Sequence, residues 1–299
     1  MKVLNYLPKK VKFVMELEFP IINDFYPRVG FIGGRIGYAK DVIFKWLLVK
    51  KVTNWDYRSV AHVSGISYQT LARRNTQFSK HNVYQKFFQY LVKQAVKADL
   101  ITGEKVAIDS SFVKTYSQKQ ESGSGKWNGF KKGFGFKIHA LIDVVTKFPI
   151  ALVITDGLMY DGRLAIPLMK RAKPYLKKHR YVLADKGYDD TDIVAWIVKN
   201  LKSKAGIPMR KKSKLAKGKS NRYGNLLNWK LKATGRTFKK SIYKLRTEIE
   251  RFFSSLKRKY YLGKELTRGI EAFTNNAYLA LICYALNKLY LVGVRSFQL

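Results

Sequence analysis

The sequence has very little cysteine: Cys283 stands alone among 299 residues. A single thiol can form no intramolecular disulfide and cannot supply a cysteine-rich zinc site. Cys283 lies within an apolar stretch, so we expect it to be a small residue of the core. The chemistry of this protein therefore has to come from other side chains.

Long apolar runs are also missing. The most apolar stretch covers residues 277–286, where Asn287 and Lys288 interrupt it, so it is too short to cross a bilayer. Residues 1–19 mix lysines with Glu16 and Glu18 and contain no continuous apolar segment of the kind that a secretory signal needs. These absences predict a protein that does not enter a membrane and stays in the cytoplasm.

Acidic residues are scarce as well. The chain carries 58 Lys or Arg against 20 Asp or Glu, which gives a formal charge of +38. Such a balance destabilises the compact state by self-repulsion unless a polyanion relieves it. Ribosomal and membrane-surface proteins can be as basic, but they rarely combine this charge with a hydrophobic content of 46%. The composition favours a folded protein that binds nucleic acid.

Residues 1–100 show mainly helical patterns, and residues 59–74 fit a helix-turn-helix. In this interpretation Gly65 makes the turn and Ser67 caps the second helix. The second helix would present the following side chains to a DNA major groove: Tyr68, Gln69, Arg73 and Arg74. Arg74, however, falls where the motif often has an apolar residue. A plain helical hairpin explains the pattern equally well.

The pattern changes from residue 105 onwards. Apolar runs predict strands at 106–109, 135–145, 149–155, 181–185 and 207–209, with helices at 163–175 and 191–200. This order predicts an α/β fold with a mixed five-stranded sheet and helices on both faces. We expect a helical domain over residues 1–100 and a sheet domain over residues 101–299.

Three carboxylates stand at distinctive positions. Asp109 and Asp185 follow apolar runs that predict strand ends, and Glu250 belongs to a polar stripe near the C-terminus. On one helix, Tyr243, Arg246, Glu250 and Lys257 would fall within roughly 60° of arc. Beside them runs a stripe with the period of a packed face: Ile242, Leu245, Ile249, Phe252, Phe253, Leu256 and Tyr260. An ordinary surface salt bridge would explain the Glu-x6-Lys pair alone.

The order of these residues resembles the DDE transposases of bacterial and archaeal insertion sequences. Asp109 comes first, Asp185 follows within Ala-Asp-Lys-Gly-Tyr-Asp-Asp, and the Tyr-x2-Arg-x3-Glu-x6-Lys motif matches at all four positions. Thr155-Asp156-Gly157 through Asp161 is also similar, and the N-terminal part around Tyr57-Arg58 more loosely. The resemblance spans most of residues 55–290. It implies an RNase H-like catalytic domain after the helical, DNA-binding N-terminal domain.

The resemblance also implies a chemistry. Asp109, Asp185 and Glu250 would hold two Mg²⁺ or Mn²⁺ ions, because converging carboxylates need cations and such ions prefer oxygen ligands. Arg246 and Lys257 would clamp phosphate oxygens, and Tyr243 would bond a neighbouring phosphate. Water would cut the transposon ends, and the freed 3′-hydroxyls would attack target DNA, with no nucleotide cofactor. The expected partners are double-stranded DNA and a second copy of the chain in the synaptic complex, near the nucleoid of a prokaryote.

A basic insertion separates the second aspartate from the glutamate, at a place where the family carries variable insertions. Residues 193–247 contain 17 Lys or Arg and no Asp or Glu, with the insertion itself at about 200–240. Lys211 and Lys212 are candidates for DNA contact. Trp229 is a candidate for stacking on an extruded base, as an aromatic does in related transposases. Packing with Leu226, Leu227, Leu231 and Phe238 in a small satellite core is the more common fate of such a residue.

Several polar residues fit a structural role or a different chemistry. A further group of aspartates is better explained by helix capping or turns, with Asp161 in a supporting role by its family position: Asp143, Asp156, Asp161, Asp189, Asp190 and Asp192. His139 is expected to be a satisfied structural residue. Tyr243 as a covalent nucleophile lacks the Arg and His cluster of tyrosine recombinases, and Ser110-Ser111 lacks a nucleophile elbow. A catalytically inactive or domesticated transposase-derived DNA-binding protein is the alternative of a different class.

Overall fold

The computed structural model describes residues 8–26, 37–116, 123–176, 180–209, 240–264 and 268–297. The chain divides into two compact units. Met1–Gln94 and Ser255–Leu299 form one, here called the helical unit, and Ala95–Ser254 forms the other, the sheet unit. The C-terminal residues thus group with the N-terminal helices. The assignment of DNA binding and catalysis to residues 1–100 and 101–299 stays a prediction, because compactness does not assign a function.

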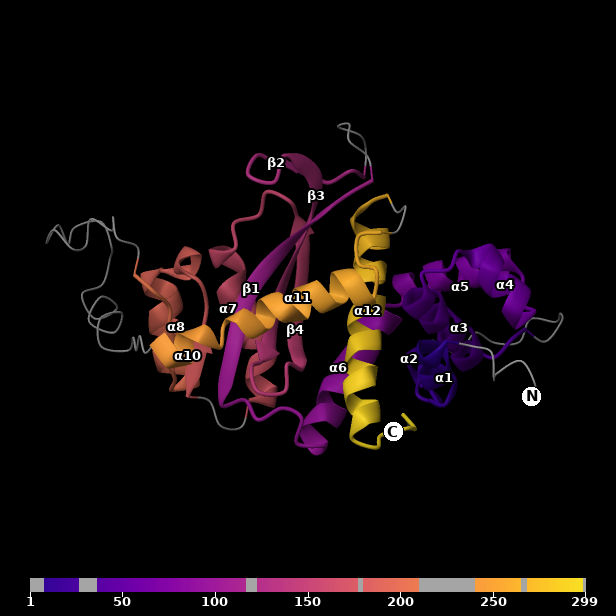
Figure 1. The fold of residues 1–299 in the computed structure, drawn as a ribbon, viewed down its shortest axis with the longest axis horizontal. Helices are drawn as coiled ribbons and strands as arrows, with labels where there is room; N and C mark the ends of the chain where they lie inside the picture. Colours follow the sequence, from indigo (N-terminus) through magenta and orange to yellow (C-terminus); the bar gives the residue numbers. More distant parts are fainter. Residues whose placement is uncertain are drawn as a thin grey trace, which may run out of the picture. The chain divides into compact units, whose positions relative to one another are not determined.

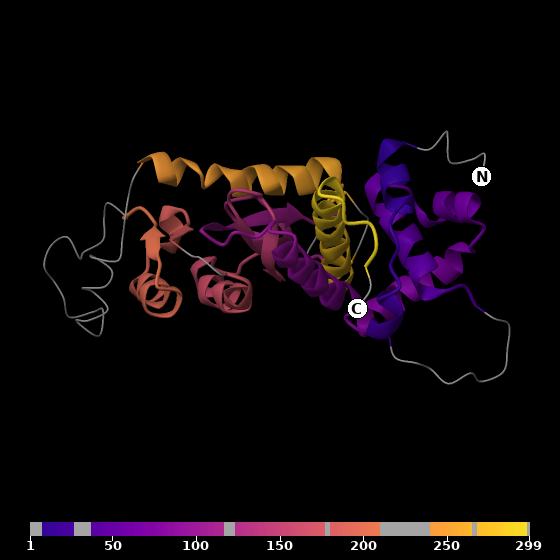
Figure 2. The ribbon, with the colours of Figure 1, turned by 90° about the horizontal axis from the view of Figure 1, so that it is seen from below.

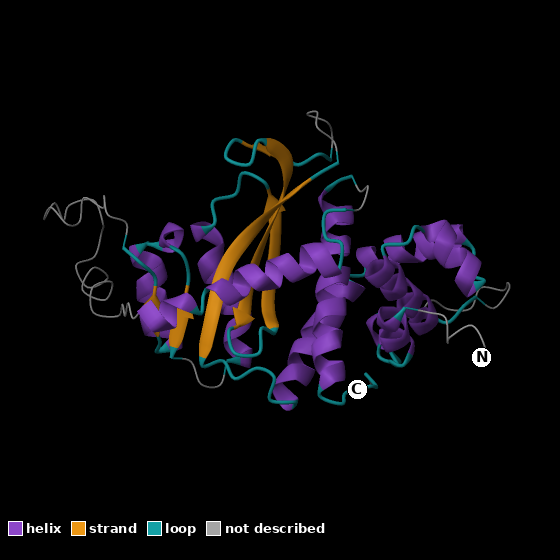
Figure 3. Ribbon diagram, in the orientation of Figure 1, coloured by secondary structure: helices purple, strands orange, loops and turns teal. Residues whose placement is uncertain are grey.

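The sheet unit is built on a mixed sheet (Figures 1 and 3). Its strands are β1 (Lys105–Lys114), β2 (Lys126–Asn128), β3 (Gly133–Asp143), β4 (Pro149–Asp156), β5 (Tyr181–Leu183) and β6 (Lys204–Gly206). β3 pairs antiparallel with β1, β2 and β4, whereas β5 runs parallel to both β1 and β6. The order β4-β3-β1-β5-β6 is the predicted mixed five-stranded sheet, and the short β2 extends its edge.

Helices cover both faces of this sheet (Figure 2). α7 (Gly162–Ala172) packs on β3 and β4, a 3₁₀ turn follows at Lys173–Tyr175, and α8 (Thr191–Leu201) packs near β6. The other face is covered by α10 (Lys240–Lys244) and the start of α11 (Thr247–Lys259). The first half of β1 is buried on both faces, so consecutive residues there are apolar: Val106, Ala107 and Ile108.

The turn between β3 and β4 is fixed by Asp143, which is fully buried. Its Oδ2 accepts hydrogen bonds from the amides of Thr102 and Gly103, and its Oδ1 accepts from the amides of Val145 and Thr146, at 2.9–3.0 Å. A buried carboxylate is stable when its oxygens are satisfied in this way. Asp143 therefore ties the segment before β1 to the hairpin, which confirms its predicted role in a turn.

The helical unit consists of α1 (Lys9–Met15), α2 (Ile22–Phe25), α3 (Lys40–Thr53), α4 (Tyr57–Ser64), α5 (Tyr68–Lys80), α6 (Val83–Lys97) and α12 (Ile270–Leu291). Its core contains edge-on aromatic pairs among Phe19, Phe44 and Phe87, and Phe19 stacks on Phe297. α12 packs on α3 and buries Cys283, as expected. Within the described segments no helix is long and apolar enough to cross a membrane.

Several boundaries differ from the sequence prediction. β1 continues to Lys114 instead of ending at residue 109, so Asp109 lies inside the strand and not at its end. The last strand lies at Lys204–Gly206, three residues before the predicted 207–209. The apolar Ile207 led to the prediction of a strand at 207–209. It is fully buried, but it follows the three residues that pair with β5. The predicted helix through Tyr243 and Lys257 is interrupted between α10 and α11. The predicted basic insertion at about 200–240 lies for the most part outside the described residues.

Candidate active site

Asp109 lies in the middle of β1, and Asp185 follows the end of β5. The two strands run parallel, with Ala107 opposite Leu183. Two residues further along, the same register brings Asp185 beside Asp109. Asp185 is close enough to raise the pKa of Asp109. Neighbouring strands therefore bring together the two aspartates that the sequence places at strand ends.

Arg246 links this pair to the third carboxylate. Its Nη1 donates to Asp109 Oδ2 at 3.1 Å, and its Nη2 donates to Glu250 Oε1 at 2.6 Å. The side chains of Arg246 and Asp109 are only 17% and 19% exposed, whereas that of Glu250 is 54% exposed. The planar guanidinium can hold two carboxylates at once. Arg246 is therefore the counter-ion that Asp109 and Glu250 share.

The backbone around Arg246 corrects the prediction of one continuous helix. The amides of Leu245 and Arg246 donate to the carbonyls of Ile242 and Tyr243, three residues back, so the chain makes a tighter 3₁₀-type turn between α10 and α11. Leu245 is 36% exposed, which leaves no buried face to support a regular helix at this point. Further along, the apolar stripe is buried as predicted: Ile249, Phe252, Phe253, Leu256 and Tyr260.

Asp109 is electrostatically strained. Burial raises the pKa of Asp109 to about 6, and Asp185 and Asp161 add to this rise, while the Ser110 amide and Arg246 oppose it. The Ser110 amide donates to Asp109 Oδ1 at 2.8 Å. A carboxylate in this environment gains from any nearby cation, because a cation offsets the cost of burying its charge.

A buried phenol also reaches this site. After β5 the chain makes a 3₁₀ turn, Lys186–Tyr188, which Asp185 caps by accepting the Gly187 amide at 2.6 Å. The turn carries Tyr188 inward, where its hydroxyl is buried and has no hydrogen-bond partner in the part of the chain that the structure describes. Burial raises the pKa of Tyr188 well above its ordinary value, and Asp109, Asp161 and Asp185 act in the same direction. Its hydroxyl can serve as a donor close to three carboxylates.

Asp161 precedes α7, but its side chain does not cap that helix. Its Oδ1 instead accepts from Lys137 Nζ at 3.1 Å and lies 3.7 Å from His139 Nδ1. His139 is fully buried on β3, its Nε2 lies 2.9 Å from Thr155 Oγ1, and burial lowers the pKa of His139 to about 4. His139 is therefore neutral at pH 7. Asp161 therefore contacts Lys137 on β3 and does not cap α7, and the supporting role implied by its family position stays a prediction.

Turn and cap roles are confirmed for two further aspartates. Asp156 accepts the amides of Leu158 and Met159, and Asp190 accepts the amides of Asp192 and Ile193 at the start of α8. Both therefore stabilise local backbone.

Residues 102–286 match the family model described as transposase DDE domain, which covers well over half of the chain. The chain belongs to the transposase DDE domain family. The fold comparison agrees with this membership. The piggyBac transposase, solved as a synaptic complex with hairpin DNA, is similar over 100% of this chain and 79% of that chain, with a TM-score of 0.50 and 10% identity.

At 10% identity the similarity to piggyBac transposase concerns the fold alone, and it identifies the sheet unit as RNase H-like. The Mos1 strand transfer complex aligns over 88% of this chain and 81% of that chain, with 10% identity and a TM-score of 0.26, which is too low to support an argument. No curated protein sequence matches the chain.

The donor set of this DDE domain fits a divalent cation. Carboxylate oxygens are the ligands that Mg²⁺ and Mn²⁺ prefer, and a cation would relieve the repulsion between Asp109 and Asp185. Among the described residues, however, no three Asp, Glu, His or Cys side chains gather closely enough to hold a metal ion. Glu250 is bonded to Arg246, and that guanidinium stands against Asp109. The residues thus fit the ion in chemical type, with two carboxylates adjacent and the third paired with arginine.

The remaining candidates of the Tyr-x2-Arg-x3-Glu-x6-Lys motif in this DDE domain lie on two successive helices, Tyr243 on α10 and Lys257 on α11. The Arg246 guanidinium carbon lies 5.8 Å from the centroid of the Tyr243 ring. Lys257 is seven residues beyond Glu250 on α11, so both side chains leave the helix on the same side. Their roles toward DNA stay predictions.

The helical hairpin predicted at residues 59–74 is formed by α4 and α5. Gly65 takes a φ of 71° at the turn, and Ser67 Oγ accepts the Thr70 amide at 3.2 Å. Gln69 and Arg73 are exposed, whereas Arg74 is half-buried and its Nη1 donates to the Tyr26 hydroxyl at 3.4 Å. Arg74 is therefore held by the protein itself. Three further candidates lie outside the described residues: Lys211, Lys212 and Trp229.

Sequence reasoning gave no role to Tyr188 or Lys137. Tyr188 stands in the Ala-Asp-Lys-Gly-Tyr-Asp-Asp segment, three residues after Asp185, so its position beside a strand-end aspartate was a usable signal. Lys137 offered none, because its contact with Asp161 depends on how β3 pairs with β4.

Proposed function

We propose that the protein is an active transposase. It binds the ends of an insertion sequence, cleaves them by metal-dependent phosphodiester hydrolysis and joins the 3′ ends to target DNA by transesterification. The observation that supports this proposal most is the meeting of Asp109 and Asp185 on neighbouring strands, with Glu250 tied to Asp109 through Arg246. Three distant parts of the chain supply these side chains, and a DDE domain needs such an arrangement.

Asp109 and Asp185 would hold the divalent cation, with Glu250 as the third ligand. When bound, such ions activate an attacking oxygen and stabilise the leaving one. Arg246 would then turn from Asp109 to a phosphate oxygen near the scissile bond, since a guanidinium pairs with phosphate as well as with carboxylate. Lys257 on α11 and Tyr243 on α10 would hold neighbouring phosphates. Tyr188, whose hydroxyl makes no hydrogen bond among the described residues, would donate to one of these carboxylates or to a phosphate oxygen once DNA is bound.

DNA binding would combine electrostatic attraction to the phosphates, which supplies most of the affinity, with base contacts that supply the sequence specificity. The formal charge of +38 supplies an attraction to phosphate that does not depend on sequence. The exposed Gln69 and Arg73 on α5 would contact base edges in a major groove, as the second helix of a helix-turn-helix does. The two copies needed to hold two element ends would meet only in the complex with DNA.

The alternative is a DNA-binding protein derived from a transposase that no longer cleaves. One observation favours it: Arg246 neutralises both Asp109 and Glu250, and no metal-binding group of three is assembled within the described residues. The two proposals differ in a single property, which is cleavage of DNA in the presence of Mg²⁺ or Mn²⁺.

The test uses supercoiled plasmid carrying candidate element ends, incubated with Mg²⁺, Mn²⁺ or EDTA, with cut sites mapped to the nucleotide. Asp109→Asn, Asp185→Asn and Glu250→Gln are compared with Asp156→Asn, a control whose carboxylate serves only a turn. We expect cleavage by the wild type and the control with either ion, and none by the three site variants, while end binding survives in all. Binding without cleavage by the wild type would favour the inactive protein.

A further inference from the structure

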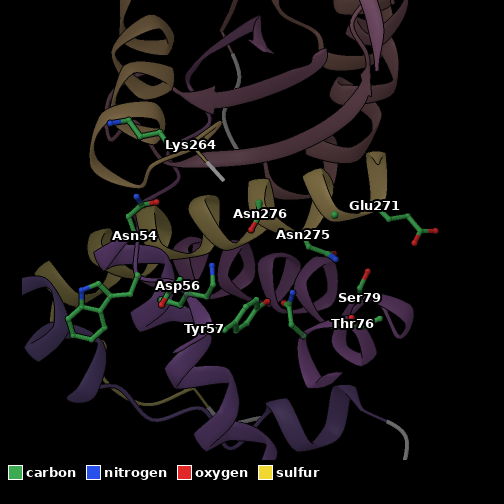
Figure 4. Close-up of a pocket in the computed structure, with 13 residues that line it drawn as sticks. Asn54, Asp56, Tyr57, Thr76, Ser79, Lys264, Glu271, Asn275 and Asn276 are labelled. Carbon is green, nitrogen blue, oxygen red and sulfur yellow. The ribbon is translucent and has the colours of Figure 1, made fainter. Parts of the chain in front are cut away.

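A pocket of about 490 Å³ lies within the helical unit, and none of the residues that line it belongs to the candidate active site. Its walls come from the turn between α3 and α4, from α5, from Lys264 and from the first turns of α12 (Figure 4). The volume falls within the range of about 300 to 1,000 Å³ that small-molecule sites occupy. The walls combine amides, aromatic rings and ammonium groups, and this combination indicates what the pocket can hold.

The amide of Asn275 carries the argument. Its residue is only 8% exposed, it borders the pocket, and its side chain makes no hydrogen bond to any residue in the described ranges. The residues that follow it on α12, from Ala277 onwards, are buried and mostly apolar. The polar atoms of this amide are not sealed off from the pocket, so they are left to bond to water or to a ligand there. A polar ligand in the pocket would give this amide the partner that the protein does not.

Other amides face the same space. Asn276 is the next residue on α12, and Asn54 directly follows α3 (Figure 4). On α5, Asn75 Oδ1 accepts the hydroxyl of Tyr84, and its amide nitrogen bonds to the Tyr57 oxygen, so Asn75 holds two tyrosines of the pocket region in place. Amide side chains carry a donor and an acceptor side by side, and this pair matches the hydrogen-bonding edge of a nucleobase.

The aromatic and charged groups narrow the choice of ligand. Trp55 and Tyr57 line the pocket and offer faces on which a base can stack. Two lysines, Lys50 and Lys264, are balanced by Asp56 and Glu271 in the same lining. A pocket with balanced charge does not attract a polyanionic backbone, in contrast to the rest of this basic protein. It suits a neutral base, with a single phosphate placed toward a lysine.

We infer that this pocket binds one unpaired nucleotide, with its base against Trp55 and Tyr57 and its edge bonded to the asparagine amides. The nucleotide can come from DNA, extruded or single-stranded, or from the free nucleotide pool. The first source rests on the proposed function, because it requires a DNA-binding protein. The second does not.

The experiment uses full-length protein in EDTA, so that it does not depend on cleavage. A duplex carrying one bulged 5-iododeoxyuridine is irradiated with the protein, beside the same duplex with that base paired, and cross-linked residues are mapped by mass spectrometry. We expect cross-links at Trp55 or Tyr57, at least fivefold stronger for the bulged duplex. Thymidine monophosphate added in excess separates the sources: loss of the cross-link assigns the pocket to free nucleotides as well, and persistence assigns it to DNA.

Variants test the amide directly. Asn275→Leu should lower the cross-link yield at least fivefold and leave the melting temperature unchanged or raised, while the exposed control Asn23→Leu keeps the wild-type yield. If Asn275→Leu does not fold, Ala272→Phe fills the pocket from another position and should give the same loss. Cross-links that form only outside the pocket, or equal yields for bulged and paired duplexes, would overturn the inference. Asp109→Asn should keep the cross-link, so a failure of catalysis and a failure of this pocket are told apart.

Discussion

Replacing Arg246 with methionine removes the guanidinium that stands between Asp109 and Glu250 and keeps most of its apolar volume. The contact with Asp109 is the costly one to lose, because both side chains are more than four-fifths buried. Breaking one partner of a buried ion pair costs about 3–5 kcal/mol when the other charge stays unpaired. Glu250 is 54% exposed, so its contact adds less than about 1 kcal/mol. Since Asp109 can escape part of the penalty by taking up a proton, we expect a loss of about 2–4 kcal/mol at pH 7.5.

The pH dependence of this loss tests the reasoning. The pKa of Asp109 is about 6 even with Arg246 present, so near pH 5 the carboxyl group is neutral in most molecules and gains little from a counter-ion. The destabilisation should therefore shrink to about 1 kcal/mol at pH 5. Urea unfolding in EDTA, followed by intrinsic fluorescence at both pH values, measures the difference between wild type and variant.

Arg251→Met is the matched control. Arg251 lies on α11, five residues after Arg246, and pairs with Glu248, but its side chain is 68% exposed, so we expect a loss below about 1 kcal/mol at either pH. A loss below about 0.5 kcal/mol for Arg246→Met at pH 7.5, or one that is the same at both pH values, would refute the view that Arg246 is the counter-ion of a buried carboxylate.

Three more predictions follow from individual side chains. Burial lowers the pKa of Lys51 from 10.5 to about 7, so between these pH values the amine of Lys51 is protonated in the unfolded chain and neutral in the folded one. The free energy of unfolding therefore falls as the pH drops from 10.5 to 7. In urea titrations, Lys51→Met should remove this pH dependence and stabilise the protein by up to about 3 kcal/mol at pH 8. Tyr188→Phe removes a buried hydroxyl without a partner among the described residues, so unfolding should show a change below about 1 kcal/mol, while cleavage slows; a loss above about 2 kcal/mol would mean that the hydroxyl is structurally bonded. In a gel-shift titration, Gln69→Ala should reduce the difference in binding free energy between element ends and random DNA by about 1–3 kcal/mol. Arg74→Met, which loses only the contact with Tyr26, should leave that difference unchanged.

Much of the architecture was predictable because local patterns and global topology agree in this chain. Asp109 and Asp185 could be placed on neighbouring strands, since each follows an apolar run and the order of elements predicts a mixed sheet. The hairpin of α4 and α5 was predictable from Gly65 and Ser67, because a left-handed turn and a helix cap have clear residue preferences. Burial of Phe252 and Phe253 followed from helical periodicity in the same way.

Long-range contacts of polar side chains were not predictable from these patterns. Lys137 reaches Asp161 only through the pairing of β3 with β4, and Arg74 reaches Tyr26 from a part of the chain 48 residues away. The break between α10 and α11 depends on how little of Leu245 can be buried, which periodicity alone does not reveal. The dual contact of Arg246 follows from that break and from the sheet register together, so neither the motif nor its spacing contains it.

The central claim is that Asp109 and Asp185 hold a divalent cation for DNA cleavage, and a change of ligand tests it most directly. Asp185→Cys replaces a hard oxygen with a thiolate, which binds Mg²⁺ poorly and Mn²⁺ better. Cleavage of plasmid carrying element ends is measured for wild type and variant with each ion at matched concentrations. The account predicts that the wild type cleaves with both ions and that Asp185→Cys cleaves only with Mn²⁺. Cleavage by Asp185→Cys in Mg²⁺ at the wild-type rate, or cleavage by the wild type in EDTA, would contradict it.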